Sequence, residues 1–137
     1  MTEQSFLARR LDSGTWPIAV GDFVVLFAFL LVGVLRHWTF AQLQANPGIY
    51  LNAAAPFFVG WLLVAPLVGA YSPGARSAPN SSIPLAIRSW IPAAIVGLLI
   101  RATPVVDGGF DPVFAAIMIV GGAVSLSVWR LLYFKLR

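Results

Sequence analysis

The chain has no cysteine and few charged side chains for its length of 137 residues. Charged residues make up 10% of it and hydrophobic residues 59%, and the mean hydropathy is +0.85. Water-soluble domains average roughly 25% charged and 45–50% apolar residues. A chain this short cannot bury so much apolar surface in a core of its own. The composition therefore indicates an integral membrane protein with a single domain.

The missing residue types also exclude several kinds of chemistry. Without cysteine the chain forms no disulfide, no cysteine-ligated zinc site and no thiol nucleophile. One histidine and five acidic residues are few candidate ligands for a metal ion. We therefore expect neither a metal nor a cofactor. The sequence has no paired-acid, Ser/His or metal-ligand motif, so we expect that the protein is not an enzyme.

The charge that is present is mostly positive, with a net charge of +4 and a pI of about 10.4. These basic residues do not form a patch between aromatic side chains, as a nucleic-acid-binding surface would. They stand singly at the ends of apolar segments, which fits contacts with lipid headgroups. We therefore expect the lipid bilayer as partner and no nucleic acid. The residues concerned are Arg36, Arg88, Arg101, Arg130 and Lys135.

Four apolar segments, each about the 20 residues that a helix needs to cross roughly 30 Å of hydrocarbon, account for most of the chain. Asp111-Pro112 is a typical helix start, with an acidic N-cap followed by proline. The apolar run after Arg9-Arg10 is interpreted as a permanent span, because Asp22 opens it and Arg36 lies where a signal peptide would be cleaved. The predicted fold is an all-α four-transmembrane-helix bundle at 17–134, with spans at about 17–38, 49–71, 83–102 and 112–134, an N-terminal segment 1–16 and a tail 135–137.

Lysine and arginine are distributed unequally between the two sides of these spans. One side carries only Arg36 and Arg101. By the positive-inside bias, the richer side faces the cytoplasm. We therefore predict a multi-pass protein of the cell membrane with both termini cytoplasmic. The richer side carries Arg9, Arg10, Arg76, Arg88, Arg130, Lys135 and Arg137.

Three charged residues share a depth near the cytoplasmic ends of the spans: Asp22, Arg88 and Arg130. Asp22 lies about five residues into the first span, roughly 7 Å along a helix axis. We predict that the three form one polar cluster, whose net positive charge would suit an anionic headgroup or solute. The alternative is that both arginines reach outward to the headgroups, and that Asp22 binds a proton or a cation.

A second polar group is expected at the outer ends, where Arg36 and His37 close the first span and Arg101 closes the third. These residues either bind a proton or ligand together or lie singly in the membrane interface. In the second span, Pro56 and Pro66 are predicted helix-break positions, because each removes one helix hydrogen bond. Such breaks line cavities in some transporters and merely bend the helix in others.

Small residues between Gly121 and Ser127 indicate close helix packing in the fourth span. Four helices of this length make a thin bundle with little room for a solvated pore. We therefore expect a homo-oligomer, or a complex with an unidentified membrane partner, that uses this face.

The order and spacing of several residues resemble a prokaryotic membrane family, domain of unknown function 3054, over about residues 20–132. Members often have an arginine directly after the glycine of the first span, where this chain has Val34. The resemblance implies a four-span architecture and no known activity. The matching residues are Asp22, Gly33, His37, Pro56-Phe57, Gly60-Trp61, Arg101-Ala102, Phe114 and Trp129-Arg130.

The sequence therefore predicts a non-catalytic binding or assembly component of the cell membrane. The alternative is a small oligomeric transporter or channel for a proton-coupled or anionic solute. The strong charge bias argues against transporters that pair in opposite orientations, because these need a weak bias.

Overall fold

The computed structural model describes residues 9–103 and 111–136, and within these ranges it contains helices, turns and no strand. Four helices are long and apolar enough to cross a membrane, which confirms the predicted all-α class and the four spans. They have 20 to 25 residues each. The long helices are α2 (Trp16–Leu35), α4 (Gly48–Val68), α5 (Pro79–Arg101) and α6 (Pro112–Leu136), and the short elements are η1 (Ser13–Thr15), α3 (Phe40–Ala45) and η2 (Pro73–Arg76).

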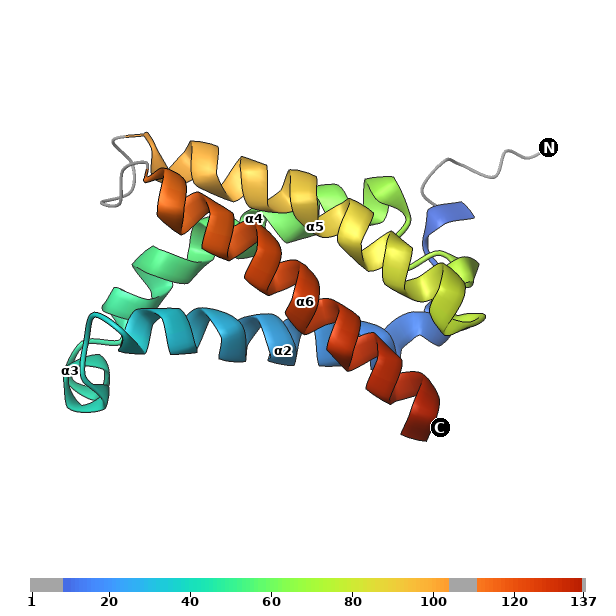
Figure 1. Cartoon of the computed structure of the whole chain (residues 1–137), viewed down its shortest axis with the longest axis horizontal. Coiled ribbons are helices and arrows are strands. Elements are labelled where there is room, and N and C mark those ends of the chain that lie inside the picture. Colours follow the sequence, from blue (N-terminus) through green and yellow to red (C-terminus); the bar gives the residue numbers. More distant parts are fainter. Residues whose placement is uncertain (1–8, 104–110, 137) are drawn as a thin grey trace.

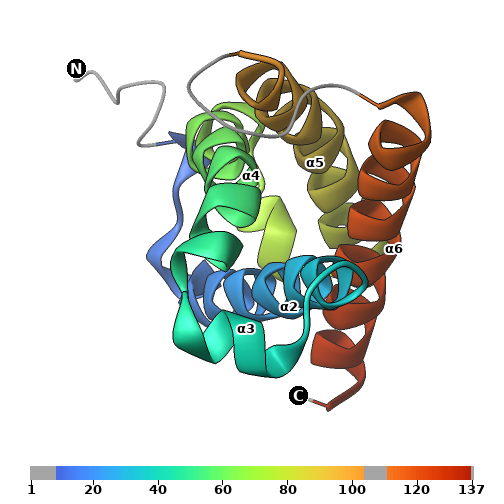
Figure 2. The same cartoon turned by 90° about the vertical axis from the view of Figure 1, so that its left-hand side faces the viewer.

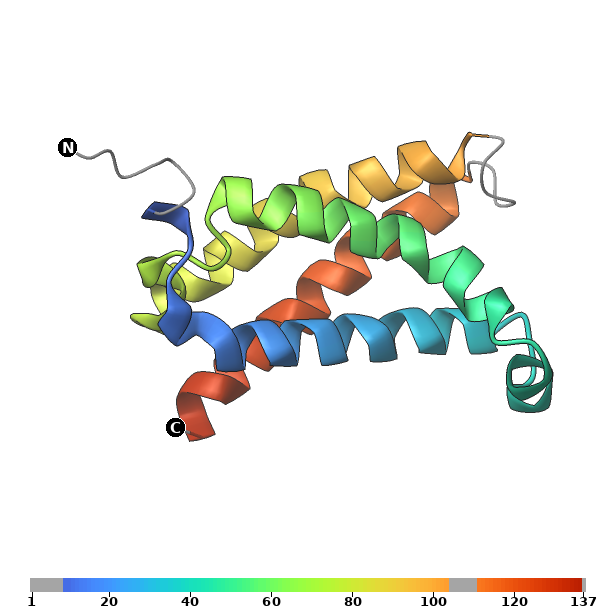
Figure 3. The same cartoon turned by 180° about the vertical axis from the view of Figure 1, so that it is seen from behind.

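The four long helices lie around a common interior (Figure 2). α4 packs along α5, α5 packs along α6, and α6 crosses α2 obliquely (Figures 1 and 3). α2 touches α4 much less than α4 touches α5. We call the end at which α2 begins and α6 ends the terminal side, and the end at which α2 stops and α4 begins the distal side.

The structure differs from the predicted spans at two places, for identifiable reasons. The third span begins four residues before the predicted Ile83, because Pro79 occupies the first turn after an extended Ala78. The connection after the first span contains α3, whose capping box pairs the Thr39 hydroxyl with the Gln42 amide and the Gln42 side chain with the Thr39 amide. By contrast, α6 begins as predicted, with the Asp111 carboxylate accepting a hydrogen bond from the Val113 N–H at 3.1 Å.

Small residues set the close contacts between the helices. A Cβ on Gly60 would collide with the backbone carbonyl of Ala93, so this glycine lets α4 and α5 touch. Trp129 covers Gly21 near the terminal side, and Phe29 covers Gly121 nearer the distal side. α2 and α6 are therefore held together at two points along their length.

The small face of α6 serves the bundle itself. Gly121 lies under Phe29 and Gly122 under Trp90, and both contacts are internal. These two glycines therefore pack within the bundle, and the expected assembly of several copies or of a partner complex stays a prediction. The residues that α6 turns outward are large and apolar, as lipid contact requires: Val113, Ile117, Val120, Val124, Val128 and Leu131.

α4 continues without interruption through both of its prolines. Pro56 and Pro66 therefore do not divide the helix, although each lacks the N–H that would complete a helix hydrogen bond. The helix ends instead at Gly69, which adopts the left-handed conformation with φ of 101°. This turn directs the chain back into the bundle, so that Ala70 is buried and Tyr71 half-buried.

Candidate functional site

A fully buried ion pair joins α2 to α6 on the terminal side. The Arg130 Nη2 lies 2.6 Å from Oδ2 of Asp22, and its Nε lies 3.3 Å from Oδ1. Both side chains have no exposed surface. The guanidinium therefore meets the carboxylate through two parallel N–H···O bonds, the strongest geometry for such a pair.

Arg130 also binds two other segments of the chain. Its Nη1 donates to the backbone carbonyl of Ser82 at 3.0 Å and to the Ser82 hydroxyl at 3.3 Å. Its Nη2 donates to the carbonyl of Ala70 at 3.2 Å. One arginine of α6 thus connects α2, the turn after α4 and the first turns of α5. Ser82 lies in the first turns of α5 and is a buried acceptor.

Two aromatic residues complete this group. The Tyr71 hydroxyl donates to Oδ2 of Asp22 at 2.8 Å, and the Trp61 indole donates to the Tyr71 oxygen at 2.9 Å. Burial, followed by the neighbouring Asp22 carboxylate, raises the pKa of Tyr71 above its ordinary value. The phenol therefore stays protonated and acts as a donor. We call Asp22, Tyr71, Ser82, Arg130 and Trp61 the polar network.

Arg88 takes no part in the polar network. Its side chain is exposed, and its Nε reaches the carbonyl of Pro84 in its own helix at 3.4 Å. The predicted three-residue cluster is therefore corrected to a pair, because Arg88 lies on the outward face of α5. With one acid and one base the buried pair is neutral, so it lacks the excess of positive charge that was predicted for the cluster.

The hydrogen bonds to Asp22 fit a carboxylate. Three donors from Arg130 and Tyr71 converge on its two oxygens, and a carboxylate accepts hydrogen bonds at both. A protonated acid would direct its own hydrogen at a donor. This arrangement describes a structural ion pair better than a cation- or proton-binding site.

A cavity of about 870 Å³ opens on the distal side. It lies between the last turns of α2, the first turns of α4 and α6, and the end of α5. This volume is within the roughly 300–1,000 Å³ typical of small-molecule sites. Phe29, Phe57 and Met118 are the lining residues furthest from the distal helix ends, so they form its inner end. We call it the distal cavity.

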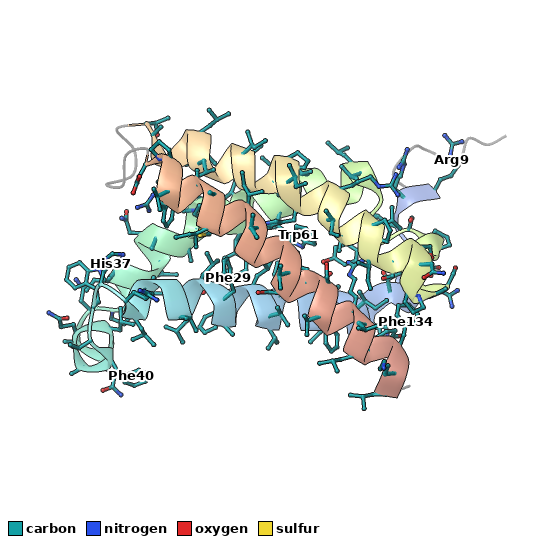
Figure 4. All side chains as sticks on the ribbon, in the orientation of Figure 1. Arg9, Phe29, His37, Phe40, Trp61 and Phe134 are labelled. Atoms are coloured by element: carbon teal, nitrogen blue, oxygen red, sulfur yellow. The ribbon has the colours of Figure 1, made fainter. Side chains whose placement is uncertain are left out.

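All three residues predicted for the outer polar group line the distal cavity. Arg36 and His37 are exposed at the end of α2, and Figure 4 shows His37 there. Arg101 is half-buried at the end of α5, with its guanidinium carbon 4.4 Å from the centroid of the Phe114 ring. The Arg101 Nε is buried and, within the described ranges, has no hydrogen-bond partner.

Several residues that build these two sites were not predicted from the sequence. Asp111 and Asn52 also line the distal cavity, and the only signal for Asp111 was its helix-capping position. Tyr71 was predicted to be the last residue of the second span. Its hydrogen bond to Asp22 depends on the turn at Gly69. Trp61 is fully buried, and Figure 4 shows it in the middle of the bundle.

A line of contacts runs from the cavity to the polar network. The Trp90 indole donates to the carbonyls of Met118 and Ile119, at 3.0 and 3.1 Å. Its ring lies 6.4 Å from that of Phe57 and 6.3 Å from that of Trp61, measured between centroids. Trp61 then binds the network through Tyr71. Aromatic side chains thus fill the space between the inner end of the cavity and the ion pair.

Among residues 9–103 and 111–136, no group of three or more His, Asp or Glu side chains is placed to hold a metal ion. No curated protein and no solved structure matches the chain significantly. Residues 19–133 match the family described as "Protein of unknown function (DUF3054)". That range contains α4 and α5, most of α2 and α6, the ion pair and the described lining of the cavity, and the resemblance seen in the sequence is confirmed. The chain therefore belongs to the DUF3054 family.

Proposed function

We propose that this chain is a non-catalytic binding component of the cell membrane that takes up a small ligand in the distal cavity. The observation that carries the proposal is the cavity itself, which combines an apolar interior with charged residues around its opening. Small-molecule sites have this composition, mostly apolar with a few polar groups. Each of the four long helices contributes to the lining, so the fold as a whole forms the site.

The residues of the cavity support binding more than catalysis. Among the described residues, its lining contains no serine, threonine or lysine that would act as a nucleophile. His37 and Asp111 are the described lining residues of a type that serves as a general acid or base, and both are exposed. Catalytic acids and bases usually lie in buried sites among groups that hold them in place.

The charge bias supports a cavity that opens away from the cytoplasm. The terminal side carries Arg9, Arg10 and Arg76 as well as Lys135 and Arg88, whereas the distal side carries Arg36 and Arg101. Under the positive-inside bias the terminal side is cytoplasmic. Both termini then face the cytoplasm, and the ligand arrives from the outer leaflet or the outer aqueous phase.

Native mass spectrometry of the purified protein in a mild non-ionic detergent tests the proposal. Gly33 lines the cavity, and a Cβ there meets open space, so Gly33→Phe should fill the cavity without straining the helix. Val24→Phe is the matched control, because Val24 lies on the lipid-facing surface of the same helix at 61% exposure. We expect a co-purified small molecule on the wild type and on Val24→Phe that Gly33→Phe loses. Equal occupancy of all three proteins, or none on any, would refute a binding function for this cavity.

A transporter is the second candidate, supported by the position of the ion pair. Aromatic residues connect the cavity to the polar network. A carrier would have to open the terminal side, which the polar network closes. Release of the Asp22–Arg130 pair would be the natural step for such opening. Proteoliposomes loaded with the co-purified molecule separate the two functions: a carrier exchanges it across the bilayer, whereas a binding component retains it.

A further inference from the structure

The charges around the distal cavity define the class of ligand more narrowly. The lining contains two arginines, Arg36 and Arg101, and one described acid, Asp111. One oxygen of Asp111 already accepts a hydrogen bond from the Val113 N–H, as the cap of α6. The described lining therefore carries an excess of positive charge even with His37 neutral. A ligand with a negative group fits this opening better than a neutral or cationic one.

Arg101 is placed to bind such a group. The Phe114 ring lies against its guanidinium at 4.4 Å and fixes its plane, leaving the N–H edge to face a partner. The Nε is buried without a hydrogen-bond partner among the described residues. A buried donor that lacks a partner is rare and calls for an explanation. Arg101 lines the cavity, so an anionic group with two oxygens bound there can meet its guanidinium in the paired geometry that arginine favours.

The interior of the cavity is apolar and is complementary to an apolar part of the same ligand. Leu30, Phe57 and Met118 are buried side chains of the lining. The opening is also apolar on one side: Val32 of α2 and Ile117 of α6 line the cavity and are 61% and 58% exposed. α2 and α6 touch at Phe29 and Gly121, and their distal ends lie apart (Figures 1 and 3). A ligand can therefore enter sideways from the bilayer.

We propose that the distal cavity binds a membrane amphiphile with one anionic headgroup, carboxylate or phosphate, on an acyl chain. Arg101 binds the headgroup, Arg36 adds to its attraction, and the chain lies against Leu30, Phe57 and Met118. This assignment rests on the proposed binding function and names its ligand class. It requires that affinity depend on the negative charge and on the apolar chain together.

The test titrates three probes into the purified protein in a non-ionic detergent and follows binding by native mass spectrometry. The probes are dodecyl phosphate, dodecanol and inorganic phosphate. We expect dodecyl phosphate to bind the wild type, dodecanol to bind at least tenfold more weakly, and inorganic phosphate not to bind measurably. Arg101→Gln should weaken dodecyl phosphate binding by roughly tenfold or more, the effect of losing a charge-assisted hydrogen bond.

Arg88→Gln is the matched control, because it removes the same charge from an exposed position of the same helix on the opposite side. It should leave the affinity within twofold of the wild type. Arg36→Gln provides a second variant at an exposed position if Arg101→Gln fails to fold, and it should reduce the affinity severalfold. Unchanged binding to a folded Arg101→Gln and to Arg36→Gln would overturn the proposal.

The remaining outcomes separate the alternatives. If inorganic phosphate binds as tightly as dodecyl phosphate and depends on Arg101, the ligand is a free anion and the amphiphile is excluded. If dodecanol binds as well as dodecyl phosphate and only Gly33→Phe abolishes binding, the ligand class is wrong but the cavity still binds. If Gly33→Phe changes nothing, the proposed function itself fails.

Discussion

Arg130 and Asp22 are the two charged side chains that are fully buried in the described part of the chain. The stability of each in this position depends on the other. Removing a charge from water is costly, and their attraction offsets this only while both are present and hydrogen-bonded. The pair therefore fixes the alignment of α2 with α6 and contributes little to the net free energy of folding. If one partner is removed, the other stays buried without compensation.

A double-mutant cycle measures this dependence. Asp22→Asn or Arg130→Gln alone should lower the free energy of unfolding by about 3–5 kcal/mol, the usual cost of breaking a buried pair. The double variant should lose clearly less than the sum of the two. Denaturant unfolding in detergent micelles, with Arg88→Gln as control, gives the values. Strict additivity would mean that the pair contributes no coupling.

Tyr71 should make the stability depend on alkaline pH. Its pKa is raised in the folded state by burial and by the Asp22 carboxylate, whereas the unfolded phenol titrates near its ordinary value of about 10. Its contribution is therefore complete below pH 10 and decreases as the pH rises further, because only the unfolded state then ionises. We expect the wild type to lose stability more steeply above pH 10 than Tyr71→Phe. Parallel pH profiles of thermal unfolding would exclude this role.

At this scale the sequence predicted part of the site. The match in depth of Asp22 and Arg130 follows from counting residues along two helices, and the structure brings them together. Arg88 has a similar depth but faces outward. Depth along a helix does not show toward which side of the helix a residue points. Tyr71 lies beyond the end of its helix, where the path of the chain depends on tertiary contacts.

At the scale of helices, the sequence predicted the spans well because a membrane requires long uninterrupted apolar segments. Their ends were less certain, since polar or proline-containing turns can extend a helix, as Pro79 does for α5. The packing of α4 on α5 could not be predicted, because it depends on which glycine faces a neighbour. Gly60 faces a carbonyl of α5, whereas Gly33 faces open space.

These two glycines should respond in opposite ways to the same change. Gly60→Ala pushes a methyl group against the Ala93 carbonyl and should cost about 1–3 kcal/mol, as overpacking does. Gly33→Ala meets nothing and removes backbone freedom, so it should be neutral or stabilising by up to about 1 kcal/mol. Thermal unfolding of both variants in the same detergent checks the contrast. Equal effects would show that the α4–α5 contact is not close at Gly60.

For the molecule as a whole, the two sides differ in character. The terminal side is held by the buried ion pair and its hydrogen bonds, and the distal side is hollow. A structure that is closed on one side and open on the other suits one-sided binding. Which aqueous phase the cavity faces then decides which ligands reach it, and that orientation is a prediction from the charge bias.

The absence of cysteine allows this orientation to be measured without background. Asn46→Cys places a thiol at an exposed position on the distal side, and Asn80→Cys places one at an exposed position on the terminal side. With both termini cytoplasmic, a membrane-impermeant maleimide should label Asn46→Cys in intact cells and Asn80→Cys only after permeabilisation. Permeabilised cells control for reactivity, since both variants should label there. The reverse pattern would place the distal cavity in the cytoplasm, and labelling of both in intact cells would indicate insertion in two orientations. Either result would change the source of the ligand while leaving the helix packing and the ion pair as described.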